Sequence, residues 1–207
     1  KEDTPMMKQY REARASLTPE TLLLFRLGDF YEMFEVDAER GAPVLGITLT
    51  KRHDMAMAGF PFHAAEGYLA KLLANGYKVA ICEQLEAPKA GKLVKRGITR
   101  ILTPGTVLEE RQLEAGQNNF ILALDCDKKG ARAAWLDLST GKFVLASVED
   151  PNDLLAAFAS LGPHEYLMPE GLAGRASRNP DLATFLDEFQ NLLGEVTRTD
   201  RPDYDFD

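Results

Sequence analysis

The chain has 207 residues, of which 45% are hydrophobic, and a formal net charge of −8. This length and apolar content allow one large hydrophobic core or two modest ones. No apolar segment approaches the ~20 residues of a membrane span, and no signal-peptide pattern opens the chain, so we expect neither a membrane protein nor a secreted one. Cys82 and Cys126 lie in apolar runs without metal-ligand spacing, which predicts buried thiols in a reducing cytosol.

The two halves of the chain differ in charge. Residues 1–107 carry 15 Lys and Arg against 13 Asp and Glu, a net charge of +2, whereas residues 108–207 carry 9 against 19, a net charge of −10. Contacts to phosphate groups would therefore come from the first half, because the second half repels polyanions as a whole. The difference predicts two domains with different roles.

The first elements are expected to alternate between helix and strand. Thr4–Pro5 predicts a helix start, with a cap followed by proline at the first helical position. The bulky apolar run at residues 22–25 predicts a buried strand. Gly28 ends this strand, and Asp29 is a good N-cap for a second helix that includes residues 30–38.

Phe30 and Glu32 fall in the first turn of this predicted helix, where two interpretations are open. In the structural one, Glu32 completes a capping box with Asp29, and Phe30 packs into the core beside Phe34. In the functional one, Phe30 stacks on a flat group and Glu32 accepts a hydrogen bond next to it. Spacing alone favours the structural interpretation.

The rest of the first half continues the α/β pattern. Residues 47–52 predict a strand that ends in two basic residues, residues 64–75 a helix and residues 77–84 another strand. The basic segment 89–100 is either a solvated hairpin or a phosphate contact. His63 is interpreted as a helix-start residue, because no metal-ligand spacing accompanies it.

The second half predicts three hairpin-linked strands followed by alternating helix and strand. Such an order is typical of a mixed α/β sheet. The expected elements are strands at 120–125, 132–138 and 142–146, a helix at 153–161, a strand at 165–167 and a helix at 181–193.

The string Gly-Asp-Phe-Tyr-Glu-Met-Phe at residues 28–34 resembles the signature of the MutS family of DNA mismatch-repair proteins. Further matches follow in the family's order, so that the resemblance covers residues 6–106 closely and the remainder more loosely. They are residues 47–52, 57–63, 68–72, 79–84 and 100–106. The resemblance implies a mixed-sheet mismatch-recognition domain at 1–107, a linker at 108–116 and a ribonuclease-H-like connector domain at 117–207.

The resemblance also implies which residues contact DNA. In the family a Phe-x-Glu pair probes the duplex through the minor groove, and this pair corresponds to Phe30 and Glu32. The implied DNA-binding set is completed by Lys51, Arg52 and Met57. By themselves, Lys51 and Arg52 are equally well interpreted as a solvated strand end. The loop at 53–56 is shorter than is often found in the family, so contacts made by longer loops are not carried over.

The family's partners and cofactors follow from the same resemblance. They are mismatched double-stranded DNA, a MutL-type repair protein bound through the connector domain, and a second copy of the full-length protein. ATP and magnesium belong to an ATPase part further along the full-length protein, and the present chain contains no GxxxxGK[ST] motif. The opening Lys1 and the abrupt end suggest a segment of a longer protein. The resemblance implies a bacterial, cytoplasmic and nucleoid-associated location for that protein. We expect no catalysis and no metal site within this segment.

Two other function classes compete with this interpretation. Asp125 and Asp137, with Asp127 nearby, are predicted on neighbouring strands, where ribonuclease-H-like nucleases hold metal ions. The favoured interpretation is that they are strand-end and turn aspartates on an acidic surface. The acidic second half also fits a pure protein-interaction module.

Overall fold

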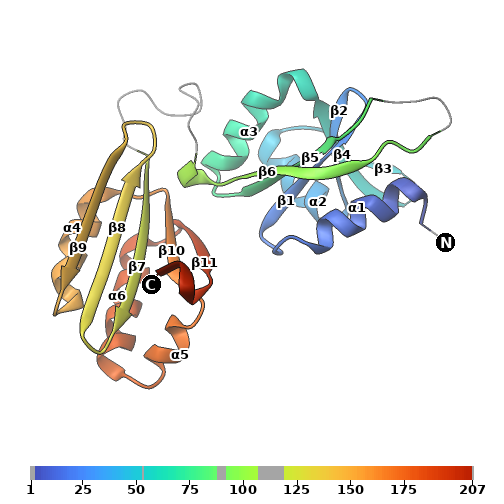
Figure 1. Ribbon diagram of the computed structural model, residues 1–207. Coiled ribbons are helices and arrows are strands. Elements are labelled where there is room, and N and C mark those ends of the chain that lie inside the picture. Colours follow the sequence, from blue (N-terminus) through green and yellow to red (C-terminus); the bar gives the residue numbers. More distant parts are fainter. Residues whose placement is uncertain (1–2, 53, 88–91, 107–118, 207) are drawn as a thin grey trace. The chain divides into compact units, whose positions relative to one another are not determined.

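The computed structural model describes residues 3–52, 54–87, 92–106 and 119–206. The chain forms two compact units, residues 1–103 (the N-terminal unit) and residues 104–207 (the C-terminal unit). Each unit has its own sheet (Figure 1). The predicted linker at 108–116 lies outside the described residues, so these exact domain bounds stay a prediction.

The N-terminal unit is built on a six-stranded mixed sheet with the order β3-β4-β2-β1-β5-β6. Strands β1 and β5 are parallel, and the other neighbours are antiparallel. The elements in chain order are α1 (Pro5–Ala15), β1 (Thr21–Leu27), β2 (Phe30–Phe34), α2 (Glu35–Leu45), β3 (Thr50–Arg52), β4 (Met55–Pro61), α3 (Ala65–Ala74), β5 (Lys78–Gln84) and β6 (Arg96–Leu102), with a short 3₁₀ turn at Phe62–Ala64.

Helices cover both faces of this sheet. On one face α1 packs its buried Met7 and Tyr10 against Leu23, Phe25 and Phe34 of the sheet. On the other face lie α2 and α3. Gly41 of α2 lies against Met33, and Tyr68 of α3 stacks on Phe60 with 4.3 Å between the ring centres. Strand residues therefore point alternately to α1 and to the α2–α3 layer.

The predicted helix over residues 30–38 is wrong in its first half, because residues 30–34 form strand β2. Leu27 pairs with Phe30, so Gly28 and Asp29 are the two turn residues of a β-hairpin. Gly28 has a φ of +58°, which is the positive φ that a type II′ hairpin turn needs at its first position. Helix α2 starts only at Glu35, and it continues through Pro43 to Leu45. The capping-box interpretation is therefore wrong, because Asp29 lies in a hairpin turn and Glu32 in a strand.

Several other elements of the N-terminal unit are confirmed. They are the opening helix, the strands at β1 and β5, and the helix α3 with buried Leu69, Leu72 and Leu73. The strand predicted at 47–52 is shorter, since β3 begins at Thr50. Arg52 pairs with Met55, so residues 55 and 56 of the predicted connection belong to strand β4, and residue 53 lies outside the described residues. The described part of the basic segment 89–100 leads into β6, the antiparallel partner of β5.

The C-terminal unit has a five-stranded mixed sheet with the order β11-β10-β7-β8-β9. Strands β7, β8 and β9 are antiparallel hairpin neighbours, and β10 and β11 are added in parallel on the other side of β7, as expected for a ribonuclease-H-like sheet. The elements are β7 (Phe120–Asp127), β8 (Gly130–Asp137), β9 (Lys142–Val148), α4 (Leu155–Leu161), β10 (Glu165–Pro169), α5 (Leu172–Ala176), α6 (Pro180–Leu193) and β11 (Thr197–Arg201), with 3₁₀ turns at Pro104–Thr106, Pro151–Leu154 and Asp203–Phe206. Of these, α5 and β11 were not predicted.

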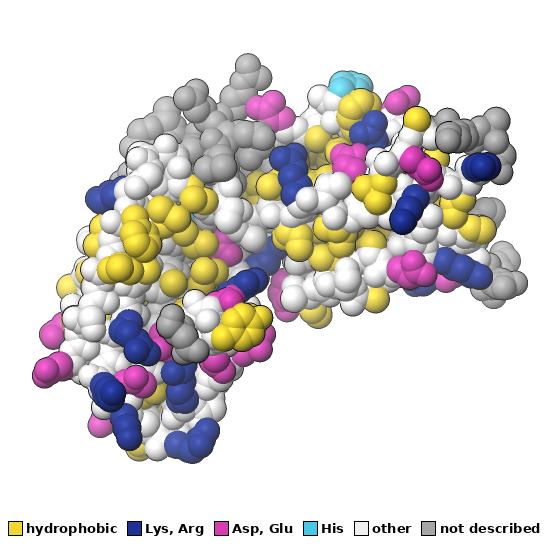
Figure 2. Space-filling view, viewed as in Figure 1, with side chains coloured by type: hydrophobic (Ala, Val, Ile, Leu, Met, Phe, Trp, Pro, Cys, Tyr) yellow, Lys and Arg dark blue, Asp and Glu magenta, His cyan; other side chains and the backbone are white. Residues whose placement is uncertain are grey.

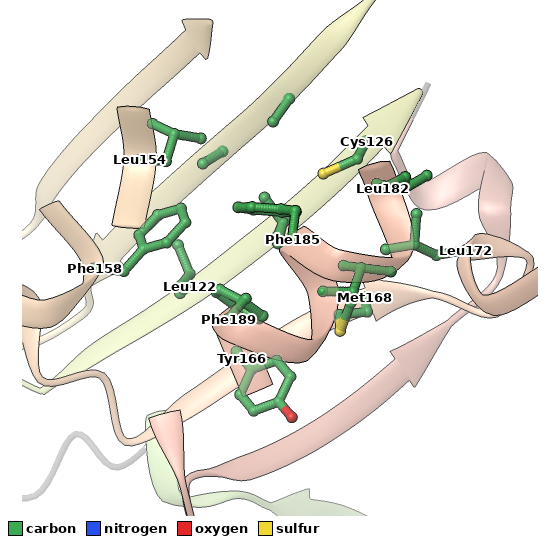
Figure 3. Close-up of a cluster of buried hydrophobic side chains, with 14 of the residues drawn as sticks. Leu122, Cys126, Leu154, Phe158, Tyr166, Met168, Leu172, Leu182, Phe185 and Phe189 are labelled. Atoms are coloured by element: carbon green, nitrogen blue, oxygen red, sulfur yellow. The ribbon is translucent and has the colours of Figure 1, made fainter. Parts of the chain in front are cut away.

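An apolar core lies between the sheet and the helices in the described part of the C-terminal unit (Figure 3). Phe158 of α4 and Phe185 and Phe189 of α6 pack with Leu122 of β7 and Met168 of β10. Helix α6 begins where Asn179 caps its first turn and Pro180 occupies its first position. Cys126 and, in the other unit, Cys82 are both fully buried, as predicted from their apolar surroundings. Within the described ranges no helix is long and apolar enough to cross a membrane.

Candidate functional site

Phe30 and Glu32 lie two residues apart on β2 and therefore point to the same face of the sheet, the face that α1 covers. Exposure falls along this strand. Phe30 is 43% exposed beside the hairpin turn, Glu32 is half-buried, and Phe34 is fully buried against Tyr10. An exposed ring next to a carboxylate thus projects from a strand whose other end is anchored in the core.

The Glu32 carboxylate lies over a glycine of the neighbouring strand. Glu32 pairs with Gly59 on β4. A methyl group placed on Gly59 would lie 2.6 Å from Cδ of Glu32 and 2.8 Å from the carbonyl oxygen of Tyr31, both closer than real contacts allow. Gly59 lies in the string Met-Ala-Gly-Phe-Pro that supports the family resemblance, but nothing in the sequence linked this glycine to Glu32.

The turn that carries Phe30 is braced from the opposite face by Arg26. Its Nε donates a hydrogen bond to the carbonyl oxygen of Gly28, and its guanidinium lies 3.5 Å from the ring centre of Phe62. The Phe62 amide in turn donates to the carbonyl oxygen of Asp29 at 2.9 Å. Because the carbonyl groups of both turn residues accept hydrogen bonds, the hairpin tip that carries Phe30 is held in place.

Two further polar residues extend this brace. The Tyr31 hydroxyl donates to a carboxylate oxygen of Glu83, and Nη1 of Arg26 lies 3.7 Å from the other oxygen. Burial, together with the hydrogen bond to Glu83, raises the pKa of Tyr31 to about 12. The phenol therefore stays protonated and keeps donating at neutral pH.

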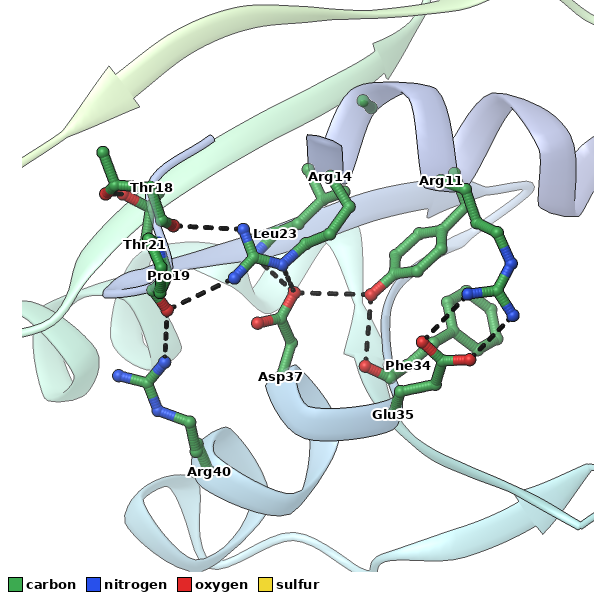
Figure 4. Close-up of polar contacts among 12 residues, drawn as sticks. Arg11, Arg14, Thr18, Pro19, Thr21, Leu23, Phe34, Glu35, Asp37 and Arg40 are labelled. Carbon is green, nitrogen blue, oxygen red and sulfur yellow. Dashed lines mark hydrogen bonds and ion pairs between the residues drawn. The ribbon is translucent and has the colours of Figure 1, made fainter. Parts of the chain in front are cut away.

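The buried end of β2 is held by a network around Asp37 (Figure 4). The Tyr10 hydroxyl lies 3.1 Å from the carbonyl oxygen of Phe34 and 3.3 Å from Oδ2 of Asp37. The same Oδ2 accepts the amide of Leu23 at 3.3 Å and lies 3.2 Å from Nε of Arg14. Asp37 is 1% exposed, and burial raises its pKa although Arg14 lowers it. This network joins α1, β1, β2 and α2.

The other predicted DNA-binding residues are divided between the two faces. Met57 pairs with Phe34 and shares the face of Phe30 and Glu32, where it is half-buried. Lys51 pairs with Ala56, which places it on the opposite face, and it is exposed. Arg52 pairs with Met55 at the end of β3. In Figure 2, positive and negative side chains are interspersed over the visible face of the N-terminal unit.

The structure separates the carboxylates that a nuclease would need. Asp125 pairs with Arg132 near one end of β7, whereas Asp137 pairs with Phe120 at the other end, five positions away. Five strand residues span roughly 17 Å, too far for both carboxylates to bind one metal ion. Asp125 is also bound to Arg132 and, at 2.6 Å, to Arg175.

Asp137 forms a turn instead. Burial by itself would raise the pKa of Asp137, but hydrogen bonds from Ser139 and Thr140 lower it below the ordinary value. The Ser139 hydroxyl donates to Oδ1 of Asp137 at 2.6 Å. Among the described residues, no group of three or more His, Cys, Asp or Glu side chains is arranged to hold a metal ion.

Comparison with known proteins gives the family. Residues 4–111 match the family model of MutS domain I, and residues 119–200 match that of MutS domain II. The chain belongs to the MutS family. It is 46% identical over 173 residues to the DNA mismatch repair protein MutS of Myxococcus xanthus, covering 81% of this chain and 19% of that protein. It is 40% identical over 208 residues to the MutS of Rhizobium meliloti, covering 93% and 22%.

A third relative, the MutS of Staphylococcus carnosus, is 39% identical over 207 residues, covering 95% of this chain. The chain spans about a fifth to a quarter of the length of these relatives, 19% to 24%. It therefore corresponds to the first two MutS domains, and the two units carry one family domain each.

Proposed function

We propose that the N-terminal unit detects mismatched or unpaired bases in duplex DNA, with Phe30 inserted into the minor groove and Glu32 bonded to the displaced base. The observation that carries this proposal is the 43% exposure of Phe30 on the same strand face as Glu32. Single exposed apolar side chains are common on protein surfaces, so the exposure supports the proposal only together with the carboxylate beside the ring on the same face. Membership of the MutS family supports the choice of ligand.

The physical task explains why an aromatic ring suits this position. Stacking hides the bases of a duplex, and the minor groove offers only a degenerate pattern of donors and acceptors. A protein that must find any mispair therefore tests how easily the duplex deforms. Inserting an apolar wedge costs about a few kcal/mol of unstacking, and this cost falls where pairing is already defective. A ring has a flat face that stacks on any base.

Glu32 would supply discrimination more than affinity. A carboxylate close to phosphates is repelled, so it weakens binding to matched DNA. A displaced base can offer a ring N–H, and the bond to the carboxylate then offsets that repulsion. The penalty on matched DNA is relieved only at a lesion, which increases the difference between the two affinities.

The remaining residues of the implied set have supporting roles in this proposal. Lys51 and Arg52, at the end of β3, would contact phosphates, and Met57 would pack beside the inserted ring. Since Lys51 lies on the opposite sheet face from Phe30, it would reach the backbone across the sheet edge rather than the opened base step.

For the C-terminal unit we propose the connector role of the MutS family. It would relay DNA binding to ATPase parts that use ATP and magnesium, and it would contact a MutL-type repair protein. In the full-length protein, two copies would hold the duplex, in a bacterial cytoplasm and nucleoid. The match to MutS domain II and the net charge of −10 over residues 108–207 support an interaction with proteins rather than with DNA.

The DNA proposal is tested by fluorescence-anisotropy titration with G·T-containing and matched duplexes at low salt. Both the 207-residue chain and a full-length MutS protein carrying these domains are measured. We expect a preference for the mismatch in the full-length protein that disappears with Phe30→Ala. Phe143→Ala is the matched control, because Phe143 is 59% exposed in the other unit. A mismatch preference that survives Phe30→Ala would refute the wedge role.

The connector proposal is tested by cross-linking a MutL-type protein to the 207-residue chain and mapping the linked peptides by mass spectrometry. We expect the links to lie between residues 119 and 206. Links confined to residues 3–103 would contradict the proposal.

A further inference from the structure

Glu32 sits between two bulkier positions of the neighbouring strand. On the face of β2 that carries it, three pairs follow one another between β2 and β4. They are Phe30 with Pro61, Glu32 with Gly59, and Phe34 with Met57. Pro61 and Met57 have side chains on this face, and Gly59 has none. The strand surface therefore has a notch at Gly59, and the Glu32 carboxylate occupies it.

Position 59 needs glycine because there is no room for a side chain, not because the backbone there has a positive φ. The described glycines with a positive φ are Gly28, Gly46, Gly76, Gly130, Gly141, Gly162 and Gly194, and Gly59 is not among them. An L-residue could therefore adopt the backbone of Gly59. Its Cβ, however, would lie 2.6 Å from Cδ of Glu32. Any side chain at position 59 must displace the carboxylate.

We propose that Gly59 is the positioning residue that determines how far the Glu32 carboxylate projects toward DNA, and thereby how strongly the protein discriminates mismatched from matched duplexes. This inference rests on the function proposed above for Phe30 and Glu32. In the notch the carboxylate is half-buried against β4 and recessed beside the more exposed Phe30. Only a base pushed out by the ring would reach it.

Filling the notch has a definite consequence. A methyl group at position 59 pushes the carboxylate outward, where it meets the phosphates of any duplex and no longer faces the displaced base. Affinity for mismatched DNA then falls more than affinity for matched DNA, because only the mismatch complex loses the hydrogen bond. We expect the ratio of the two affinities to fall at least threefold.

The experiment is a double-mutant cycle in a full-length MutS protein carrying these domains. The ratio of dissociation constants for matched and G·T-containing duplexes is measured for the unmodified protein, Gly59→Ala, Glu32→Ala and the double variant. Gly67→Ala is the matched control, since a Cβ there meets nothing within 4 Å. We expect Gly59→Ala to lower the ratio, to have no further effect on it in the Glu32→Ala background, and Gly67→Ala to leave it unchanged.

The outcomes separate the inference from the function on which it rests. If Glu32→Ala leaves the ratio unchanged, the proposed role of Glu32 fails. If Glu32→Ala lowers the ratio but Gly59→Ala does not, or if Gly59→Ala lowers it equally in both backgrounds, the positioning role of Gly59 is refuted and the role of Glu32 stands.

Thermal unfolding covers the case in which Gly59→Ala folds poorly. A Cβ at position 59 also approaches the carbonyl oxygen of Tyr31, so some loss of stability is expected in any background. If the Glu32 side chain is the main obstacle, the double variant melts at a higher temperature than Gly59→Ala alone. Equal melting temperatures of Gly59→Ala and the double variant would contradict the inference that the Glu32 side chain fills the space beside Gly59.

Discussion

The hydroxyl of Tyr10 lies 3.1 Å from the carbonyl oxygen of Phe34, so α1 is bonded to the last residue of the strand that carries Phe30 and Glu32. The two rings also meet edge to face, with 5.0 Å between their centres. Phe34 is the point at which β2 ends and α2 begins. This contact fixes the buried end of β2, while Arg26 braces its exposed end.

Replacing Tyr10 by Phe should loosen the buried end of β2. The ring contacts remain, but the Phe34 carbonyl and the Asp37 carboxylate lose a donor. We expect the free energy of unfolding to fall by about 1–2 kcal/mol, the usual cost of leaving buried acceptors unpaired. Amide hydrogen exchange at Leu23, whose N–H is bonded to Asp37, reports the local effect. Unchanged exchange there would argue against the network.

Asp37 should make the N-terminal unit less stable as the pH rises. Burial raises its pKa in the folded state above the ordinary 3.8, so the folded protein holds a proton that the unfolded chain has released. The stabilisation is complete below pH 3.8 and is lost as the pH rises through the folded-state pKa. In Asp37→Asn this loss is absent. Urea unfolding at a series of pH values should show the stability of the unmodified chain falling relative to that of Asp37→Asn across this window. A constant difference would contradict the raised pKa.

Gly28→Ala should destabilise the hairpin that carries Phe30. A Cβ at Gly28 meets nothing within 4 Å, so the cost is purely the φ of +58°, which for an L-residue amounts to about 1–2 kcal/mol. The same substitution at Gly67 in helix α3 should instead stabilise by up to about 1 kcal/mol. Equilibrium urea unfolding measures both. If the two substitutions changed the free energy of unfolding equally, the positive φ of Gly28 would not account for the effect of Gly28→Ala.

Asp125→Ala should destabilise the C-terminal unit by about 1–3 kcal/mol, because Arg132 and Arg175 lose the carboxylate that they share. The longer contacts of Arg132 to Asp127 at 3.6 Å and of Arg175 to Asp203 at 3.9 Å remain. The lower end of the range applies if the arginines, 58% and 34% exposed, regain water. Fluorescence of Trp135, the sole tryptophan of the sequence, follows the unfolding of this unit from strand β8. Asp200→Ala, which breaks an exposed pair with Arg198, is the control and should cost less than about 1 kcal/mol. If both substitutions lowered the free energy of unfolding equally, the ion pairs of Asp125 would contribute no more than an exposed surface pair.

The amino-acid sequence by itself determined the elements with unambiguous local signals. The apolar run of β1, the helix predicted at 181–193 and the buried cysteines are all strong patterns over a few residues. Ordered motif matches also identified the family and singled out Phe30 and Glu32. None of these inferences needs long-range contacts.

The tertiary structure alone decided between helix and strand at residues 30–34. The spacing of Phe30 and Phe34 fits a helical stripe, while the buried Tyr31 and Met33 fit a strand that alternates between two faces. Pairing with β1 and β4 resolves this conflict, because the backbone hydrogen bonds of β2 come from strands distant in sequence. Strand pairing also decided three other points. The β2–β4 pairing placed Gly59 next to Glu32, the β3–β4 pairing put Lys51 on the opposite face, and the β7–β8 pairing separated Asp125 from Asp137. Registers of this kind depend on which strands meet, and no local pattern contains that information.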